Sequence, residues 1–303
     1  MKKNLNFLCA LAALMCTVLM TGCQEPEPPA PSTVKFHMSF QSQFVPKRTI
    51  RVWLPTGYSK DKKYDVLYMH DGRNLFDPRI TWNNQEWGVD EAMDSLVNSG
   101  AIRPTIVVGI DNRTNMAERV AEYCPDDVGA LLPAGKVLYD GLGTPKGNDY
   151  LRFMVEELKP FIDSVYSTYP EREHTWIMGS SCGGLISSYA LCKYPDVFAG
   201  AACLSTHSTL AADPSKPDQD AIDAYRTYLQ QHLTPNACRL YMDRGDQTLD
   251  ANYADSQDAI NAMLKNAGWD DAHFMYRFFP GHAHEEASWR ARLDIPLKFL
   301  LAE

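Results

Sequence analysis

The chain has 303 residues, of which 45% are hydrophobic and 22% charged, enough apolar material for a large core and too much for general disorder. Its formal net charge of −9 at pH 7 disfavours nucleic acids and anionic membrane surfaces as partners. The sequence has no zinc-type Cys/His spacing and no glycine-rich phosphate loop, so we expect neither a metal nor a cofactor.

The N-terminus has the pattern of a bacterial lipoprotein signal. Two lysines precede the apolar run FLCALAALMCTVLM at 7–20, and two small residues then precede Cys23. The run is shorter than the roughly 20 apolar residues that a membrane-spanning helix needs. We therefore predict a signal peptide over 1–22 and lipidation of Cys23 as the first residue of the mature protein. The alternative is an ordinary signal peptide with a chance cysteine.

The residues that follow indicate a tethered, exported domain. Residues 23–33 are rich in Pro and Glu and predict an extended tether, and residues 34–303 are predicted to form one domain. This organisation predicts a periplasmic or outer-membrane lipoprotein of the cell envelope. Its contact with the membrane would be the lipid anchor alone.

The pattern of hydrophobic residues predicts two strands first and then strands that alternate with helices. Alternating apolar residues predict antiparallel strands at 34–40 and 48–55. Short apolar runs predict buried strands at 64–70, 105–110, 174–179, 200–205, 238–243 and 273–279. Helical spacing predicts helices at about 86–99, 148–166, 183–194, 220–232, 251–267 and 285–301. Antiparallel strands followed by repeated β-α units predict an α/β-hydrolase fold, with helices on both faces of a mostly parallel sheet. The polar segment 206–237 is a candidate for a small cap over a pocket.

One strand-to-helix junction carries a motif for a nucleophile. Residues 179–183, GSSCG, fit G-x-S-x-G with Ser181 at the centre, after the strand HTWIM and before the helical pattern GLISSYALCKYP. This context is that of a nucleophile elbow, in which a strained turn exposes the serine hydroxyl at the carboxyl edge of the sheet. The alternative is a turn of small residues that is required only for packing. The context favours Ser181 as a nucleophile.

A serine nucleophile needs a general base, and in this fold class the histidine follows the last strand. The stretch FFPGHAHEEASWRARL supplies two candidates, His282 and His284, between that strand and a helix. We favour His284, which stands immediately before the helix, and keep His282 as the alternative.

The orienting acid is expected after the preceding strand, in YMDRGDQTLDANY. Asp243 closes the strand, Asp246 follows Gly245 in a tight turn, and Asp250 lies at the start of the next helix. Asp250 is favoured because it could reach across to the histidine, and the other two remain open.

Two backbone N–H groups are expected to form an oxyanion hole. One belongs to Cys182, directly after the predicted nucleophile, and the other to the loop that follows the strand YMH. In that loop, Gly72 allows close approach of the backbone to substrate, so the donor is predicted to be the amide of Arg73 or Gly72. A simple strand-ending turn is the alternative.

Several ordered segments resemble a known family. YMHDGRNLFD, VVGIDN, RVAEYCP, IMGSSCGGLISSYALCKYPDVFAGAACLS and HEEASWRARL are similar to segments of the putative esterase family, which includes esterase D, feruloyl and acetyl-xylan esterases, and enterochelin esterases. The resemblance covers about 34–301 and implies a single α/β-hydrolase domain with a Ser-His-Asp triad and no metal. It supports Ser181, His284 and the Gly72–Arg73 loop. The family often has Met where this chain has Cys182.

The resemblance implies an ester substrate without naming it. An exported enzyme of this family is expected to act on acyl or feruloyl esters of polysaccharides, or on catecholate siderophore lactones. The candidates for substrate contact are Trp82, Trp87, Arg119, Glu122 and Tyr123. For each of them the alternative is a purely structural role, in core packing or in a surface ion pair. An acyltransferase on the same triad and a non-catalytic binding lipoprotein are the competing functions.

Overall fold

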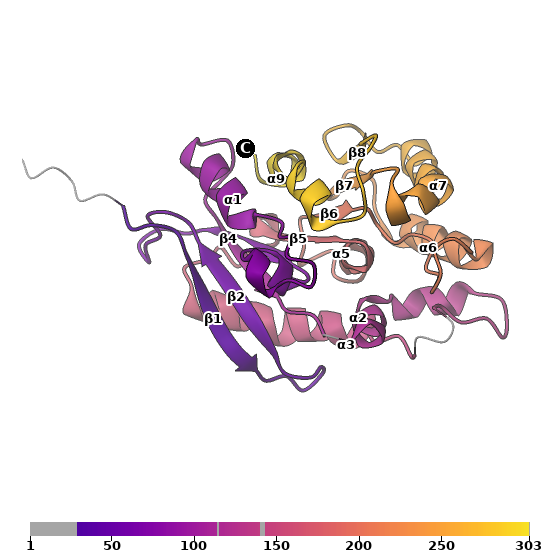
Figure 1. The fold of residues 1–303 in the computed structure, drawn as a ribbon, viewed down its shortest axis with the longest axis horizontal. Helices are drawn as coiled ribbons and strands as arrows, with labels where there is room; N and C mark the ends of the chain where they lie inside the picture. The colour runs from indigo at the N-terminus through magenta and orange to yellow at the C-terminus, as the bar shows by residue number, and fades with distance from the viewer. Residues whose placement is uncertain (1–28, 114, 140–142, 303) are drawn as a thin grey trace, which may run out of the picture.

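The computed structural model describes residues 29–113, 115–139 and 143–302. They form an eight-stranded sheet with the order β1-β2-β4-β3-β5-β6-β7-β8, in which β1, β2 and β4 pair antiparallel and all later neighbours pair parallel (Figure 1). The strands are β1 (Thr33–Phe40), β2 (Arg48–Leu54), β3 (Asp65–Met69), β4 (Thr105–Ile110), β5 (Thr175–Ser180), β6 (Gly200–Leu204), β7 (Arg239–Arg244) and β8 (Phe274–Phe278). The parallel strands β3, β5, β6, β7 and β8 therefore end at one common edge.

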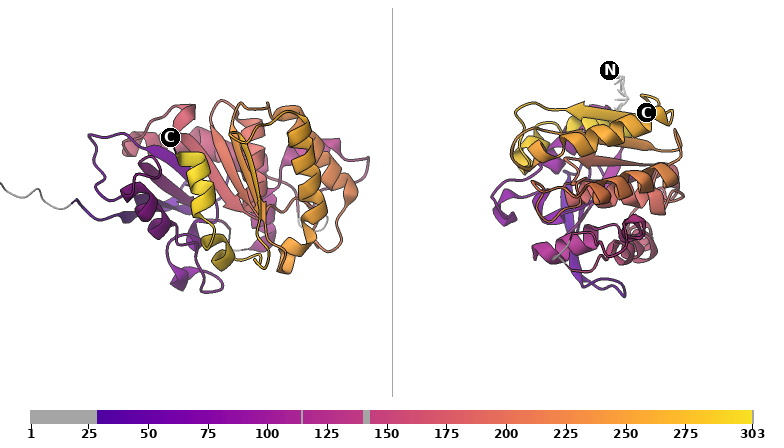
Figure 2. Two further views of the ribbon diagram at one scale, coloured as in Figure 1. Left: turned by 90° about the horizontal axis from the view of Figure 1, so that it is seen from above. Right: turned by 90° about the vertical axis from the view of Figure 1, so that its right-hand side faces the viewer.

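Helices cover both faces of this sheet and bury two separate hydrophobic cores. One face carries α1 (Val89–Asn98), α8 (Glu286–Arg290) and α9 (Asp294–Leu301), and the yellow α9 lies close to the purple α1 although the two are far apart in sequence (Figure 2). The other face carries α2 (Met116–Tyr123), α3 (Gly147–Arg152), α4 (Lys159–Val165), α5 (Cys182–Lys193), α6 (Gln219–His232) and α7 (Ala254–Asn266). The second core is the larger and includes the aromatic residues Tyr123, Tyr150, Phe153, Tyr189 and Tyr225.

The predicted strands and fold class are confirmed, while some helices differ in detail. The helix predicted at 148–166 consists of α3, a π-helical turn at Phe153–Leu158 and α4. The helix predicted at 285–301 is interrupted between α8 and α9. The segment 206–237 does not form a separate cap, because α6 packs its apolar side, including Tyr225 and Leu229, into the core as an ordinary crossover helix.

The described part of the predicted tether packs against the domain. Ala30 accepts a hydrogen bond from the Gly57 amide, Ser32 bonds to Asp94, and Thr33 already belongs to β1. The predicted signal peptide and Cys23 lie outside the described residues. Within the described residues, no helix has the length and apolar character needed to cross a membrane.

Candidate active site

Ser181 lies at the tight turn between β5 and α5. Its backbone has φ 58° and ψ −126°, a conformation that strains any residue with a side chain. The strand and helix cross closely there, since a Cβ on Gly179 would come within 2.7–2.9 Å of Gly183 and His70. The turn therefore has the geometry expected of a nucleophile elbow, at the carboxyl edge of the sheet.

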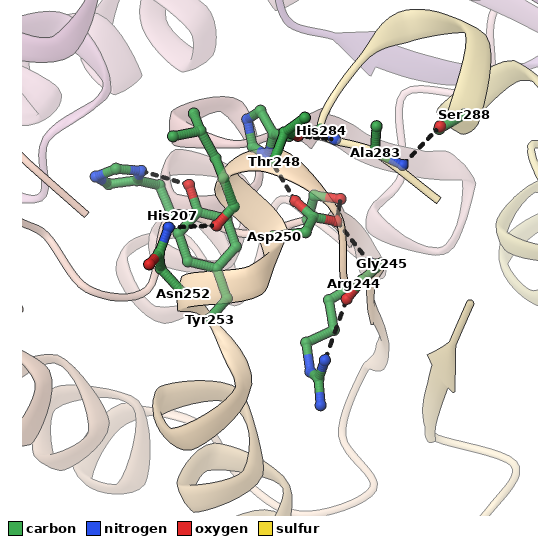
Figure 3. Close-up of polar contacts among 12 residues, drawn as sticks. His207, Arg244, Gly245, Thr248, Asp250, Asn252, Tyr253, Ala283, His284 and Ser288 are labelled. Atoms are coloured by element: carbon green, nitrogen blue, oxygen red, sulfur yellow. Dashed lines mark hydrogen bonds and ion pairs between the residues drawn. The ribbon is translucent and has the colours of Figure 1, made fainter. Parts of the chain in front are cut away.

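His284 is hydrogen-bonded to Asp250. The ring Nδ1 lies 2.6 Å from Asp250 Oδ1, and the two side chains are only 8% and 0% exposed (Figure 3). Burial by itself would raise the pKa of Asp250, but the hydrogen bond and charge of His284, with further hydrogen bonds, hold that pKa below its ordinary value. An ionised carboxylate only accepts, so Nδ1 of His284 carries the proton and Nε2 is left free to act as a base.

Two loops bring this pair together across the sheet edge. The carbonyl of His282 accepts from the amides of Asp246 and Gln247, and Asp246 Oδ1 accepts from the Gly281 amide. Thr248 Oγ1 accepts from the amide of His284 itself, at 2.8 Å (Figure 3). The loop after β7 is thus bonded along its length to the loop after β8. This docking lets an aspartate seven residues beyond Asp243 reach His284.

The alternative acid and base have other partners. Asp243 is fully buried and forms a two-pronged ion pair with Arg292, at 2.9 and 3.1 Å. Asp246 takes part in the loop–loop contact described above. His282 packs its ring on Phe279 and contributes its backbone carbonyl to the same contact. The structure therefore pairs Asp250 with His284, whereas Asp243 and Asp246 are bonded to Arg292 and to the Gly281 amide.

Ser205 connects the buried ion pair to Asp250. Its hydroxyl donates to Asp250 Oδ2 at 2.6 Å and accepts from Arg292 Nη2 at 2.9 Å and from Trp289 Nε1 at 3.0 Å. Asp250 Oδ2 also accepts from the Gly245 amide. Every polar atom of the carboxylate is therefore held, which fixes the direction in which Oδ1 faces His284. Ser205 was not among the predicted site residues, because its only signal in the sequence is a small polar residue directly after β6.

Tyr253 and His207 form a second polar pair beside Ser181. Burial raises the pKa of Tyr253 well above its usual value, while a hydrogen bond with the Ser181 side chain acts in the opposite direction. His207 Nε2 lies 2.9 Å from the Ala211 carbonyl, which can only accept, so Nε2 carries the proton of the neutral ring. Nδ1 must then accept the Tyr253 hydroxyl proton, at 2.8 Å (Figure 3).

Because two histidines are buried, we expect the free energy of unfolding to fall at acidic pH. Burial lowers the pKa of His70 to about 3 and that of His207 to about 4, from 6.5. Below pH 6.5 the unfolded chain binds protons at both positions that the folded protein excludes, so stability is lost as the pH falls through this window. We expect each histidine to account for a loss of about 2 kcal/mol of unfolding free energy between pH 8 and pH 5.

Urea denaturation at pH 8 and at pH 5 measures this loss. In His207→Gln, which does not titrate, the difference between the two pH values should be about 2 kcal/mol smaller than in the natural protein. An unchanged difference would show that His207 is not the source of the acid sensitivity.

The predicted oxyanion donors belong to loops that leave adjacent strands. Cys182 is the first residue of α5, and Gly72 and Arg73 begin the 3₁₀ turn η1 (Gly72–Asn74) after β3, which pairs with β5. N–H groups in the first turn of a helix have no partner inside that helix and so are available to a ligand. A Cβ on Gly72 would come within 2.8–2.9 Å of Gly109 and Asp111, so only glycine allows this packing.

The chain matches the family model described as "Putative esterase" over residues 42–300. It belongs to this family. The chain is 25% identical over 170 residues to YjcH of Bacillus subtilis, covering 56% of this chain and 60% of that protein. It is 25% identical over 173 residues to an endo-1,4-beta-xylanase/feruloyl esterase of Xylanibacter ruminicola, covering 53% of this chain and 20% of that protein. The chain thus spans 60% or less of the length of these relatives.

Solved structures of esterases share the fold of this family member. A ferulic acid esterase superposes with a TM-score of 0.64 at 21% identity, covering 89% of this chain and 98% of that one. The enterobactin esterase of Shigella flexneri gives 0.63 at 17% identity, covering 90% and 60%. An IroE-like serine hydrolase of Shewanella oneidensis gives 0.63 at 23% identity, covering 86% and 78%. These likenesses confirm the α/β-hydrolase fold.

The residues predicted to contact substrate differ widely in exposure. Trp82 is 79% exposed, whereas Trp87 is buried against Trp289. Glu122 is buried in an ion pair with Arg48, and Tyr123 is fully buried. The side chains of Trp87, Glu122 and Tyr123 therefore contact other parts of the protein in this structure and do not face solvent.

Arg119, the remaining predicted contact residue, binds the residue before the predicted oxyanion donors. Its guanidinium makes two hydrogen bonds to Asp71, at 2.7 and 2.8 Å, directly before Gly72. Asp71 has a left-handed backbone at φ 55°, so this ion pair holds a strained residue in place. Among the described residues of this esterase-family chain, no group of three or more His, Cys, Asp or Glu side chains is arranged to hold a metal ion.

Proposed function

We propose that this protein is an exported serine esterase that hydrolyses carboxylic esters through Ser181, His284 and Asp250. The observation that carries the proposal is the combination of a strained serine turn with a buried His284–Asp250 pair at the same edge of the sheet. Membership of the esterase family supports the reaction class.

The proposed reaction has two half-reactions that use the same groups. His284 Nε2 takes the proton of Ser181 as the serine oxygen attacks the ester carbonyl, while Asp250 stabilises the imidazolium. The backbone N–H groups of Cys182 and of the Gly72–Arg73 loop stabilise the oxyanion, each contributing roughly 3–4 kcal/mol. The alcohol leaves with the proton from His284. Water, deprotonated by the same histidine, then releases the acid from the acyl-enzyme.

The proposed substrates are acyl or feruloyl esters of polysaccharides. The name of one relative includes feruloyl esterase, and a ferulic acid esterase is among the structural neighbours, which supports this choice. Enterobactin esterases are also structural neighbours, so a catecholate trilactone is the second candidate. The signal-like N-terminus and Cys23 support export and a lipid anchor in the cell envelope.

A substrate panel with active-site labelling tests the proposal. The panel contains an aryl acetate, a feruloyl sugar ester, acetylated xylan and a catecholate trilactone, and labelling uses a fluorophosphonate that reacts with activated serines. We expect turnover of a sugar ester well above the aryl acetate and a single labelled peptide that contains Ser181. Labelling at another residue, or no hydrolysis of any of the four esters, would contradict the proposed function.

A further inference from the structure

Trp82 is a large apolar side chain that is exposed and yet held in place. The residue is 79% exposed, while its indole N–H donates to Glu286 Oε1 at 3.3 Å. Single exposed aromatic residues are common on protein surfaces. In this protein, by contrast, a buried carboxylate holds the polar end of the exposed ring.

Glu286 is buried without a cationic partner. It is 3% exposed, and among the described residues no arginine, lysine or histidine lies within ion-pair distance of it. Its two oxygens accept from three neutral donors, namely Asn74 Nδ2 at 3.0 Å, Asn83 Nδ2 at 2.8 Å and the Trp82 indole. Burial of a carboxylate is costly unless its hydrogen bonds are satisfied, and the positive end of α8, where Glu286 is the first residue, lowers that cost.

The contacts of Glu286 join three parts of the site. Glu286 comes two residues after His284, and Asn74 is the last residue of the predicted oxyanion turn Gly72–Asn74. Trp82 and Asn83 belong to the loop that leads from this turn toward α1. The carboxylate therefore fixes the exposed indole relative to both the predicted base and the predicted oxyanion donors.

The attachment of Trp82 to the loop that carries His284 indicates which half of a bound ester would lie near the indole. In serine ester hydrolysis the histidine gives its proton to the oxygen of the departing alcohol, so the alcohol half lies on the side of His284. Trp82 is tied to the loop that carries His284. The alcohol half of a bound ester is therefore the part that we expect to meet the indole.

We propose that Trp82, held by Glu286, is the platform of a subsite for the sugar ring of a glycan ester's alcohol half. This inference rests on the proposed esterase function. The negative face of an indole attracts the polarised C–H groups on one face of a sugar ring. The carboxylate of Glu286 at the N–H edge of the indole, which has no cationic partner among the described residues, disfavours a catecholate anion and leaves a neutral sugar unaffected.

Matched esters with one acyl group and two alcohols test the subsite. The substrates are a feruloylated arabinoxylan oligosaccharide and methyl ferulate, and the quantity compared is the ratio of kcat/KM for the sugar ester to that for the methyl ester. We expect Trp82→Ala to lower this ratio at least 10-fold, mainly through KM for the sugar ester. Trp82→Phe, which retains a ring, should keep the ratio within about threefold of the natural protein.

A control separates the subsite from general damage. Phe36→Ala removes another exposed aromatic side chain, 53% exposed on the edge strand β1, and should leave the ratio unchanged. Inhibition by the free oligosaccharide product should weaken in Trp82→Ala by a factor similar to the change in the ratio, which a merely structural role for Trp82 would not produce.

The possible failures can be told apart. A ratio that Trp82→Ala leaves unchanged, or an equal loss on both esters, overturns the sugar subsite while the esterase function stands. A loss confined to a catecholate trilactone overturns the choice of a neutral sugar. Absence of hydrolysis of both esters by the natural protein overturns the subsite for a feruloylated sugar, and the esterase function is then decided by the aryl acetate, acetylated xylan and trilactone of the panel.

Discussion

Ser181→Ala is expected to lower kcat for ester hydrolysis by about 10⁴- to 10⁶-fold and to change KM little. Without the hydroxyl no acyl-enzyme forms, and only oxyanion stabilisation and binding remain. The measurement is steady-state hydrolysis of the best ester in the panel, with thermal unfolding followed by circular dichroism to show that the variant is folded.

Ser180→Ala is the matched control for this prediction. Ser180 is the preceding residue, at the end of β5, and does not occupy the strained position of the turn. Its replacement should keep kcat within a few-fold of the natural protein. If the two variants lost similar activity, or if Ser181→Ala kept most of its activity, the nucleophile would have to be sought elsewhere.

Asp250→Asn is expected to lower kcat by about 10⁴-fold while the fold is kept. A carboxamide can turn its NH₂ toward Nδ1 of His284, which moves the ring proton to Nε2 and removes the base. Because the Ser205 hydroxyl and the Gly245 amide still find an acceptor in the remaining oxygen, we expect only a small change in unfolding free energy. Activity and urea denaturation of the same preparation measure the two effects.

Asp243→Asn should give the opposite pattern. This aspartate is equally buried but pairs with Arg292, and breaking a buried ion pair typically costs about 3–5 kcal/mol because the remaining charge is left uncompensated. The folded fraction should still hydrolyse esters at a rate within about tenfold of the natural protein. A large loss of kcat in Asp243→Asn with normal activity in Asp250→Asn would reverse the proposed assignment of the acid.

The sequence predicted the fold well because its signals are local. Apolar runs of five or six residues marked β4, β5 and β6, and the glycines around Ser181 marked the tight turn. Helix α2 was not predicted because its segment MAERVAEY covers only eight positions, about two helical turns, although its apolar residues recur at the four-residue spacing of a helix. The π-helical turn at Phe153–Leu158 also leaves the apolar spacing almost unchanged, so it has no clear signature in the sequence.

The candidate site was less predictable because its residues meet across long separations. Three aspartates lie within eight positions of one another, and only the docking of the loop after β7 onto the loop after β8 places Asp250 against His284. Glu286 looks like any helix-starting glutamate until Asn74 and Asn83, more than 200 positions earlier, are seen to bond to it. Burial likewise distinguishes Trp82 from Trp87, which lie only five positions apart in the sequence.

Ser205 and Glu286 belong to two different hydrogen-bond networks, and this difference has a consequence for evolution in this family. Ser205 joins the core ion pair of Asp243 and Arg292 to Asp250, so the effects of substitutions among these four residues should be strongly non-additive. Trp82 is tied to the rest of the protein through Glu286 and lies on an exposed loop. Descendants could therefore exchange the exposed platform, and with it the preferred alcohol, without first having to rebuild the stability of the sheet.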